Sequence, residues 1–276
     1  MSGALVLKLG GELLESPADR TRIAQFAASV VPSRPLVVIH GGGRAVDAEL
    51  ARRGIAPKKV DGLRVTDEAT LDVVVSELGG ASNTELVASF VGQGVPAVGL
   101  TGVDAGLGRA TRVNAHRSAS GAVVDLGFVG DPEEADAALV ELLLVNDYVP
   151  VVASLGVDAG GGKSPSILNV NADVMACRLA AALPGCDLVI AGTTPGVLDR
   201  HGKTIPSLDV DGIDALVASG TATAGMIAKL ASCRRALLDG VASARIIDGR
   251  SLDAIHGIDQ APGTTLKKTG VLASSL

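Results

Sequence analysis

The sequence has few aromatic residues: its 276 residues include three Phe, one Tyr and no Trp. Sites for single-stranded nucleic acid stack bases on aromatic side chains, so this scarcity argues against such a partner. The formal net charge of −6 argues against a phosphate-backbone partner as well, although local loops can still hold a nucleotide. Because aromatic residues are scarce, the core must consist of Val, Leu, Ile and Ala, which favours parallel strands between layers of helices.

Cysteine and long apolar runs are also scarce. Cys177, Cys186 and Cys233 are odd in number and widely spaced, which predicts reduced thiols in the cytoplasm and no metal centre. No segment approaches the run of about 18 apolar residues that a membrane span needs. The N-terminal apolar run is interrupted by Lys8 and has no basic flank, so we expect neither a leader peptide nor a membrane partner.

What the chain does contain is an apolar strand followed by glycines at its very start. Residues 5–9 read Leu-Val-Leu-Lys-Leu and run into Gly10 and Gly11. A lysine in a buried strand is costly unless its ammonium group reaches an anion, and paired glycines let backbone N–H groups approach one. Taken alone, this pattern also fits an ordinary strand end with Lys8 extended toward solvent.

The same pattern recurs in the next unit of the chain. Residues 36–39 are apolar and lead through His40 into three glycines at 41–43. A helix is predicted over 18–31, capped by Ser16 and with Pro17 at its first position, and another over 44–53. Two such units predict a right-handed parallel β-α-β arrangement. Both glycine turns should then lie at the carboxyl edge of the sheet, where open α/β sheets bind their ligands.

The whole chain is predicted to form one α/β domain over 1–268, with two lobes on one sheet and a loose tail over 269–276. The lobes are expected to divide near residue 185, giving about 1–185 and 186–268. A helix is predicted to start at Asp131, because a proline and two glutamates follow it in what would be the first turn.

Five motifs, in this order, resemble the amino acid kinase family, and the resemblance extends from about residue 5 to residue 265. The motifs are residues 8–11 (Lys-Leu-Gly-Gly), 40–43 (His-Gly-Gly-Gly), 62–66 (Gly-Leu-Arg-Val-Thr), 169–173 (Asn-Val-Asn-Ala-Asp) and 225–229 (Gly-Met-Ile-Ala-Lys). The resemblance implies a three-layer αβα sandwich with a mostly parallel central sheet. Within the family it is strongest to members that phosphorylate N-acetyl-L-glutamate.

The implied reaction is transfer of a phosphoryl group from ATP, with Mg²⁺, to the side-chain carboxylate of N-acetyl-L-glutamate in arginine biosynthesis. A carboxylate is already ionised at pH 7, so the acceptor needs no catalytic histidine or serine. The transition state spreads negative charge over the phosphoryl oxygens, and fixed cations and backbone donors stabilise it. The sequence, which has four histidines and no triad-like arrangement, is consistent with such a reaction.

The resemblance also implies roles for particular residues. Lys8 would stabilise the transferring phosphoryl group, Lys229 would hold the nucleotide phosphates, and Asp173 would orient both lysines as the third catalytic residue. Predicted substrate-binding residues are Gly42, Gly43, Arg64 and Asn169, with Arg64 gripping a carboxylate through its forked guanidinium. Predicted nucleotide-binding residues are Gly10, Gly11, Thr193, Gly196 and Lys229.

Each of these residues has an ordinary explanation when it is taken singly. Asp173 could only cap a helix, Lys229 could be a solvated helix lysine, Arg64 could lie on the surface, and His40 is most simply structural. Together they are harder to dismiss, because five motifs occur in one order. The alternatives are a family member acting on an N-acylated or carrier-linked aminoadipate, and a non-catalytic sensor of amino acids or nucleotides with the same fold.

Two departures from the family pattern affect these expectations. Thr193 stands where an aspartate is common, which places the ribose and adenine contacts in doubt. The sequence also begins only seven residues before Lys8, whereas relatives inhibited by arginine carry an additional N-terminal helix that links dimers into hexamers. This predicts an arginine-insensitive homodimer.

Overall fold

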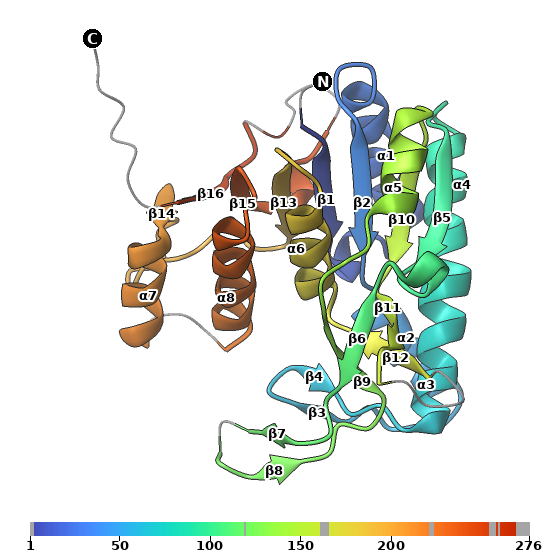
Figure 1. The fold of residues 1–276 in the computed structure, drawn as a ribbon, viewed down its shortest axis with the longest axis vertical. Helices are drawn as coiled ribbons and strands as arrows, with labels where there is room; N and C mark the ends of the chain where they lie inside the picture. Colours follow the sequence, from blue (N-terminus) through green and yellow to red (C-terminus); the bar gives the residue numbers. More distant parts are fainter. Residues whose placement is uncertain are drawn as a thin grey trace.

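The computed structural model describes residues 3–118, 120–160, 166–220, 224–253, 258 and 260–268, so the predicted tail lies outside the described residues. An eight-stranded sheet runs through the molecule in the order β14-β16-β15-β13-β1-β2-β10-β5 (Figure 1). Its neighbouring strands are parallel except at the β15–β16 pair. The strands are β1 (Leu5–Leu9), β2 (Leu36–His40), β5 (Ala97–Thr101), β10 (Val149–Ala153), β13 (Asp187–Gly192), β14 (Ser207–Asp209), β15 (Ser243–Asp248) and β16 (Gly263–Lys267).

Helices cover both faces of this sheet and make the predicted three-layer sandwich (Figure 1). One face carries α1 (Pro17–Val30) and α4 (Asn83–Val91), and the other carries α5 (Ala138–Val145), α6 (Ala172–Ala182), α7 (Val210–Ala218) and α8 (Ala224–Leu238). The remaining helical segments are α2 (Gly43–Arg52), α3 (Glu68–Val74), a π-helical stretch η2 (Val75–Ser82), and the 3₁₀ turns η1 (Gly11–Leu13), η3 (Asp104–Gly106) and η4 (Gly249–Ser251). Helix α1 begins as predicted, with Ser16 accepting a hydrogen bond from the backbone N–H of Asp19 at 3.1 Å.

The alternation of side chains along β1 decides which way its lysine points. Leu5, Leu7 and Leu9 belong to the core beneath α1 and α4, whereas Val6 belongs to the core beneath α6 and α8. Successive strand residues face opposite sides of a sheet, so Lys8 faces the same side as Val6. The strand therefore places its one cation beneath α6.

Smaller sheets lie below the right half of the main sheet in Figure 1. Four strands close on one another in the order β11-β12-β9-β6, and two separate hairpins, β3–β4 and β7–β8, lie at the bottom of the view. The bounds are β3 (Lys59–Val60), β4 (Leu63–Arg64), β6 (Arg109–Arg112), β7 (His116–Arg117), β8 (Val123–Val124), β9 (Val129–Pro132), β11 (Leu155–Asp158) and β12 (Ile167–Val170).

The predicted start of a helix at Asp131 is wrong. Asp131 and Pro132 belong to β9, where they pair with Thr111 and Ala110 of β6, and α5 begins only at Ala138. Proline is tolerated here because it is the last residue of its strand. Pairing with a distant strand thus prevails over a local pattern that favours a helix.

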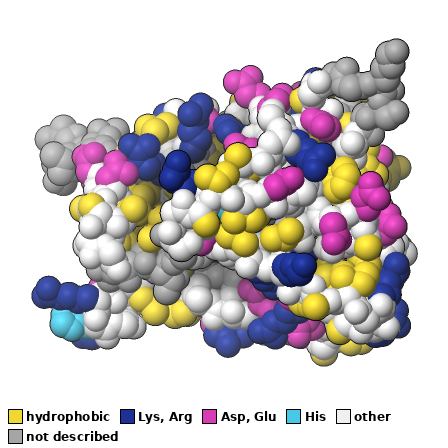
Figure 2. Space-filling view, turned by 90° about the horizontal axis from the view of Figure 1, so that it is seen from below, with side chains coloured by type: hydrophobic (Ala, Val, Ile, Leu, Met, Phe, Trp, Pro, Cys, Tyr) yellow, Lys and Arg dark blue, Asp and Glu magenta, His cyan; other side chains and the backbone are white. Residues whose placement is uncertain are grey.

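On the face shown in Figure 2, Lys and Arg side chains are interspersed with Asp and Glu rather than gathered into one basic surface. None of the helices that the structure describes is both long enough and apolar enough to cross a membrane. The three cysteines are buried and unpaired.

Candidate active site

The two glycine turns predicted from the sequence lie against each other at the carboxyl edge of the sheet. A Cβ atom built on Gly11 would lie 2.7 Å from Cα of Gly42, so only glycine permits this approach without a shift. The turn after β1 is also tied to β13, because the N–H of Gly10 donates to the carbonyl of Ala191 at 2.9 Å. Three adjacent strands, β13, β1 and β2, thus end around one point.

Asp173 bridges two lysines beside these turns. Its Oδ1 lies 2.8 Å from Nζ of Lys8, and its Oδ2 lies 3.2 Å from Nζ of Lys229. Asp173 occupies the first turn of α6, where the side chain of Asn171 caps the helix by accepting from the N–H of Asp173 at 2.8 Å. The predicted catalytic residues therefore come together from β1, α6 and α8.

The electrostatics of this group keep Asp173 ionised. Burial by itself would raise the pKa of Asp173, but the charges of Lys8 and Lys229 outweigh it and lower that pKa to about 2. One carboxylate thereby holds two ammonium groups close to each other. The three groups together carry one net positive charge. Such an arrangement favours an incoming anion at this point.

A cavity of about 960 Å³ opens beside the bridge. It extends from the ends of β1 and β13 to α8 and the small barrel, and it is large enough to hold a nucleotide-sized ligand. Its lining includes Glu12, Asp131, Asp173, Gly192, Thr193 and Lys229.

A second cavity of about 200 Å³ adjoins the first and contains the predicted acceptor residues Gly42, Gly43, Arg64 and Asn169. The two cavities share four lining residues, so they lie side by side. The shared residues are Gly62, Leu63, Val129 and Asn171. The predicted substrate residues thus line the smaller cavity, and Asp173 and Lys229 of the bridge line the larger one beside it.

Arg64 is buried and held in place by two partners. One terminal nitrogen pairs with the carboxylate of Asp47, and the other donates to the carbonyl of Gly43 at 3.0 Å. Burial raises the pKa of Asp47, but hydrogen bonds from Lys59 and Arg64 outweigh this and keep the pKa below its usual value. Asp47 therefore stays ionised and fixes the guanidinium, whose remaining N–H groups can serve a ligand.

Asn169 is fixed by a polar chain on the same wall. Its Nδ2 donates to Oγ1 of Thr66 at 3.1 Å, and that hydroxyl donates to the carbonyl of Arg64 at 2.9 Å. The amide of Asn169 is thereby oriented, with one of its two N–H donors occupied. Its oxygen keeps its acceptor capacity for a ligand N–H.

Of the predicted nucleotide residues, Thr193 and Lys229 line the large cavity, whereas Gly10, Gly11 and Gly196 do not. The carbonyl of Thr193 accepts from Nη2 of Arg250 at 3.0 Å. Gly196 lines neither cavity: it has φ of 105°, and a Cβ atom on it would lie 2.6 Å from Oγ1 of Thr264. Its glycine is required by a left-handed backbone packed against β16.

His40 is structural, as expected. It is fully buried, with Nε2 lying 3.0 Å from Nδ2 of Asn83 and Nδ1 lying 3.2 Å from the carbonyl of Gly41. Burial lowers the pKa of His40 to about 4, so the imidazole is neutral at pH 7. Its hydrogen bonds hold the second glycine turn in position.

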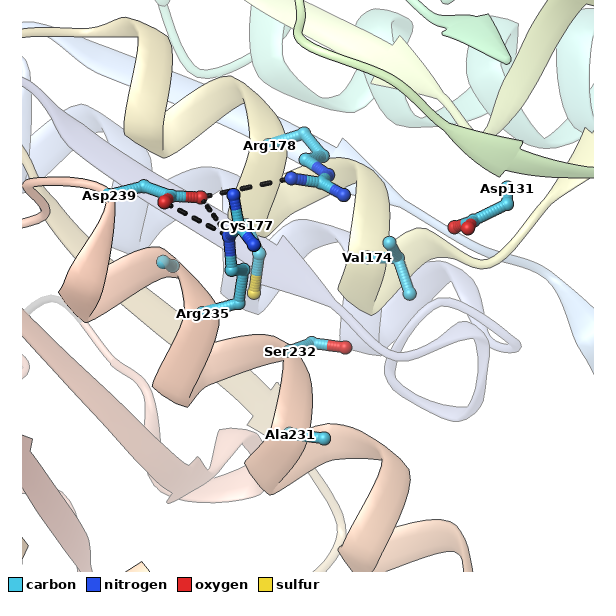
Figure 3. A pocket seen from close by; sticks show the side chains of 9 residues that line it. Asp131, Val174, Cys177, Arg178, Ala231, Ser232, Arg235 and Asp239 are labelled. Carbon is cyan, nitrogen blue, oxygen red and sulfur yellow. Dashed lines mark hydrogen bonds and ion pairs between the residues drawn. The ribbon is translucent and has the colours of Figure 1, made fainter. Parts of the chain in front are cut away.

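A third cavity, of about 220 Å³, lies between α6 and α8 (Figure 3). It shares Asp131, Val174 and Ser232 with the large cavity. Arg178 and Arg235 both face the carboxylate of Asp239. Oδ2 of Asp239 lies 3.8 Å from Nη1 of Arg178 and 2.7 Å from Nε of Arg235. One carboxylate is thus shared by two guanidinium groups on the helices that carry Asp173 and Lys229. This arrangement ties α6 to the end of α8.

Comparison with known proteins identifies the family. A model of the amino acid kinase family matches residues 3–248. The chain belongs to the amino acid kinase family. An acetylglutamate kinase from Aromatoleum aromaticum is 40% identical over 250 residues, which is 89% of this chain and 82% of that protein. An acetylglutamate kinase from Koribacter versatilis is 38% identical over 272 residues, covering 96% of this chain and 99% of that protein.

Solved structures share the fold of this amino acid kinase at low identity. N-acetylglutamate synthase from Neisseria gonorrhoeae, complexed with coenzyme A and N-acetyl-glutamate, has a TM-score of 0.82 and 22% identity; the match covers 98% of this chain and 60% of that one. Carbamate kinase from Giardia lamblia has a TM-score of 0.64 and 16% identity, covering 97% and 99%. The predicted family and α/β sandwich are confirmed.

Three residues at the candidate site of this amino acid kinase were not predicted from the sequence. Asp47 fixes Arg64, Arg250 binds the Thr193 turn, and Glu12 lies at the glycine turn after β1. Asp47 lies on helix α2 and Arg250 lies just after strand β15. Charged residues are common at both kinds of position, so neither residue stands out in the sequence. Glu12 directly follows the first glycine motif, and that position was the one available signal.

Proposed function

We propose that this amino acid kinase transfers the γ-phosphoryl group of ATP to the side-chain carboxylate of N-acetyl-L-glutamate, a step of arginine biosynthesis. The observation that carries the proposal is the bridge of Asp173 to Lys8 and Lys229 at the large cavity, which adjoins the cavity of Arg64 and Asn169. The acetylglutamate kinases that match most of the chain at 38–40% identity support the choice of acceptor.

The smaller cavity suits the acceptor. The guanidinium of Arg64 would bind a carboxylate of the acyl amino acid, and Asn169 would accept a hydrogen bond from its amide N–H. The backbone of Gly42 and Gly43 lines the same cavity and leaves room for the reacting carboxylate. That carboxylate is ionised at pH 7 and attacks phosphorus directly, without a general base.

The larger cavity suits the phosphate donor. Lys229 would bind the nucleotide phosphates, and the backbone N–H of Gly11 would donate to them, because the N–H of Gly10 already donates to Ala191. Lys8, held by Asp173, would stabilise the charge that develops on the phosphoryl oxygens during transfer. Mg²⁺, bound with ATP, would supply further positive charge to the same oxygens. We assign the acceptor lobe to residues 1–185 and the nucleotide lobe to 186–268.

We also propose a cytoplasmic homodimer whose ligands are small molecules rather than nucleic acid or membrane. β5 is the edge strand of the sheet, and α4 and α5 flank it on either face (Figure 1). Exposed apolar side chains gather on these two helices and the following turn, which suits contact with a second copy. They are Val91, Leu142, Val145 and Tyr148. The molar mass measured by light scattering should be that of a dimer for the wild type and that of a monomer for Val145→Glu.

The function is tested by trapping the acyl phosphate as a hydroxamate with a panel of acceptors. With Mg²⁺-ATP, N-acetyl-L-glutamate should react best, ahead of N-acetyl-L-aspartate, N-acetyl-L-aminoadipate and free L-glutamate. Preference for the aminoadipate would assign the longer acceptor instead. Hydroxamate from no acceptor, together with measurable ATP binding, would identify a sensor and reject the proposed reaction.

A further inference from the structure

Glu12 lies where the phosphate donor is expected. It follows the first glycine turn, and a Cβ atom built on Gly10 would lie 2.5 Å from its Oε1 and 2.6 Å from its Oε2. A Cβ atom on Gly192 would lie 3.5 Å from the same Oε1. The carboxylate thus sits over the carboxyl ends of β1 and β13, inside the large cavity.

This carboxylate has no hydrogen-bond or ionic partner among the residues that the structure describes. Two other acids of the cavity are paired: Asp173 with two lysines, and Asp61 with His116 at 2.8 Å. Asp131 also lacks an ionic partner within the described chain, but it is solvent-exposed on the small barrel rather than at the glycine turns. Glu12 is therefore the half-buried carboxylate that faces the phosphate region uncompensated.

Charge balance requires a cation at this point once the donor binds. Phosphates held by Lys229 and the glycine turn would share the space with the Glu12 carboxylate, and two anions in contact repel. A Mg²⁺ ion removes the conflict, because it binds phosphate and carboxylate oxygens and commonly takes only one or two protein carboxylates. The described residues contain no group of three or more His, Cys, Asp or Glu that could hold a metal ion alone.

We propose that Glu12 is a direct or water-bridged carboxylate ligand of the Mg²⁺ that accompanies ATP, and that it positions the metal beside the transferring phosphoryl group. The proposal rests on the proposed kinase function. It assigns a task to a residue whose negative charge would otherwise weaken nucleotide binding.

The test compares Glu12→Gln with Glu15→Gln, which removes a carboxylate three residues further on that pairs with exposed Arg44 outside the cavity. Binding of ADP is measured by calorimetry without metal, and binding of Mn²⁺ to the protein–ADP complex is measured by electron paramagnetic resonance. Glu12→Gln should weaken Mn²⁺ binding about 10- to 100-fold while metal-free ADP binds equally well or more tightly. Glu15→Gln should match the wild type in both measurements.

The outcomes separate the inference from the function on which it rests. Unchanged Mn²⁺ affinity in Glu12→Gln would overturn the inference, as would tighter binding of ADP with and without metal to the same degree, which indicates simple repulsion. A wild type that binds no ADP in either form would instead count against the kinase function. Circular dichroism and the melting temperature verify that both variants are folded.

Discussion

Nζ of Lys8 lies 2.8 Å from Oδ1 of Asp173, and this contact joins the first strand of the chain to the first turn of α6. The lysine alone would be a poorly placed buried cation, and the carboxylate alone a buried anion with one neighbour. Together with Lys229 they form a preorganised cationic pair whose geometry does not depend on a ligand. Preorganised charge is what stabilises a phosphoryl-transfer transition state, because no rearrangement is needed as the reaction proceeds.

Lys8→Met should lower kcat about 10²- to 10³-fold, because it removes one fixed cation from the transition state while keeping the length and apolar stem of the side chain. KM for ATP should change much less, since Lys229 remains. Steady-state kinetics with both substrates, together with a melting curve, check the prediction. A variant that keeps the wild-type kcat would remove Lys8 from the reaction.

Asp173→Asn should make stability less dependent on acid pH. Because the pKa of Asp173 is lowered from 3.8 to about 2, the charged carboxylate stabilises the fold above pH 4, and the stabilisation is lost as pH falls toward 2. The shift corresponds to about 2 kcal/mol at neutral pH. Urea unfolding at pH 7 and pH 3 should show the wild type losing about 1 kcal/mol more than the variant does. Equal losses in both proteins would contradict the assigned pKa.

Much of the site could be predicted because its residues belong to local patterns. A lysine in an apolar strand before two glycines already specifies a strand end, a cation and an anion-binding turn. The alternation along β1 then determines that Lys8 faces α6, and Asn171 before Asp173 specifies a helix start. What these patterns cannot specify is the distance between Lys8 and Asp173, which depends on how α6 packs on the sheet.

The rest could not be predicted because it depends on pairing across the chain. Asp131 and Pro132 look like a helix start, yet β6 recruits them into a strand. Asp47 is one charged residue on an amphipathic helix until folding brings it to Arg64. Gly196 is predicted to bind the nucleotide, and its close packing against Thr264 is set by folding and not by the local sequence.

Arg64→Lys should raise KM for the acceptor about 10- to 100-fold with a smaller effect on kcat. Lysine keeps the positive charge beside Asp47 but loses the planar fork, and a hydrogen bond to a charged group contributes about 1.5–3 kcal/mol. Lys59→Gln is the matched control, because Lys59 lines the same cavity and pairs with Asp47 from a more exposed position. Its KM should rise less. Equal effects of both substitutions would indicate that net charge, rather than the fork, binds the acceptor.

His40→Gln should flatten the pH dependence of stability between pH 6.5 and pH 4. Burial lowers the pKa of His40 to about 4 from the usual 6.5, so the unfolded chain binds a proton in this range that the folded protein does not. The stabilisation is therefore complete above pH 6.5 and is lost as pH falls, by up to about 3 kcal/mol at pH 4. Loss linked to Asp173 begins only below that range, so the two effects are separable. Urea unfolding at half-unit pH steps measures the slope, and His201→Gln, at an exposed position, controls for the removal of a histidine as such. If wild type and His40→Gln lose stability with the same slope, the second glycine turn does not depend on a neutral imidazole.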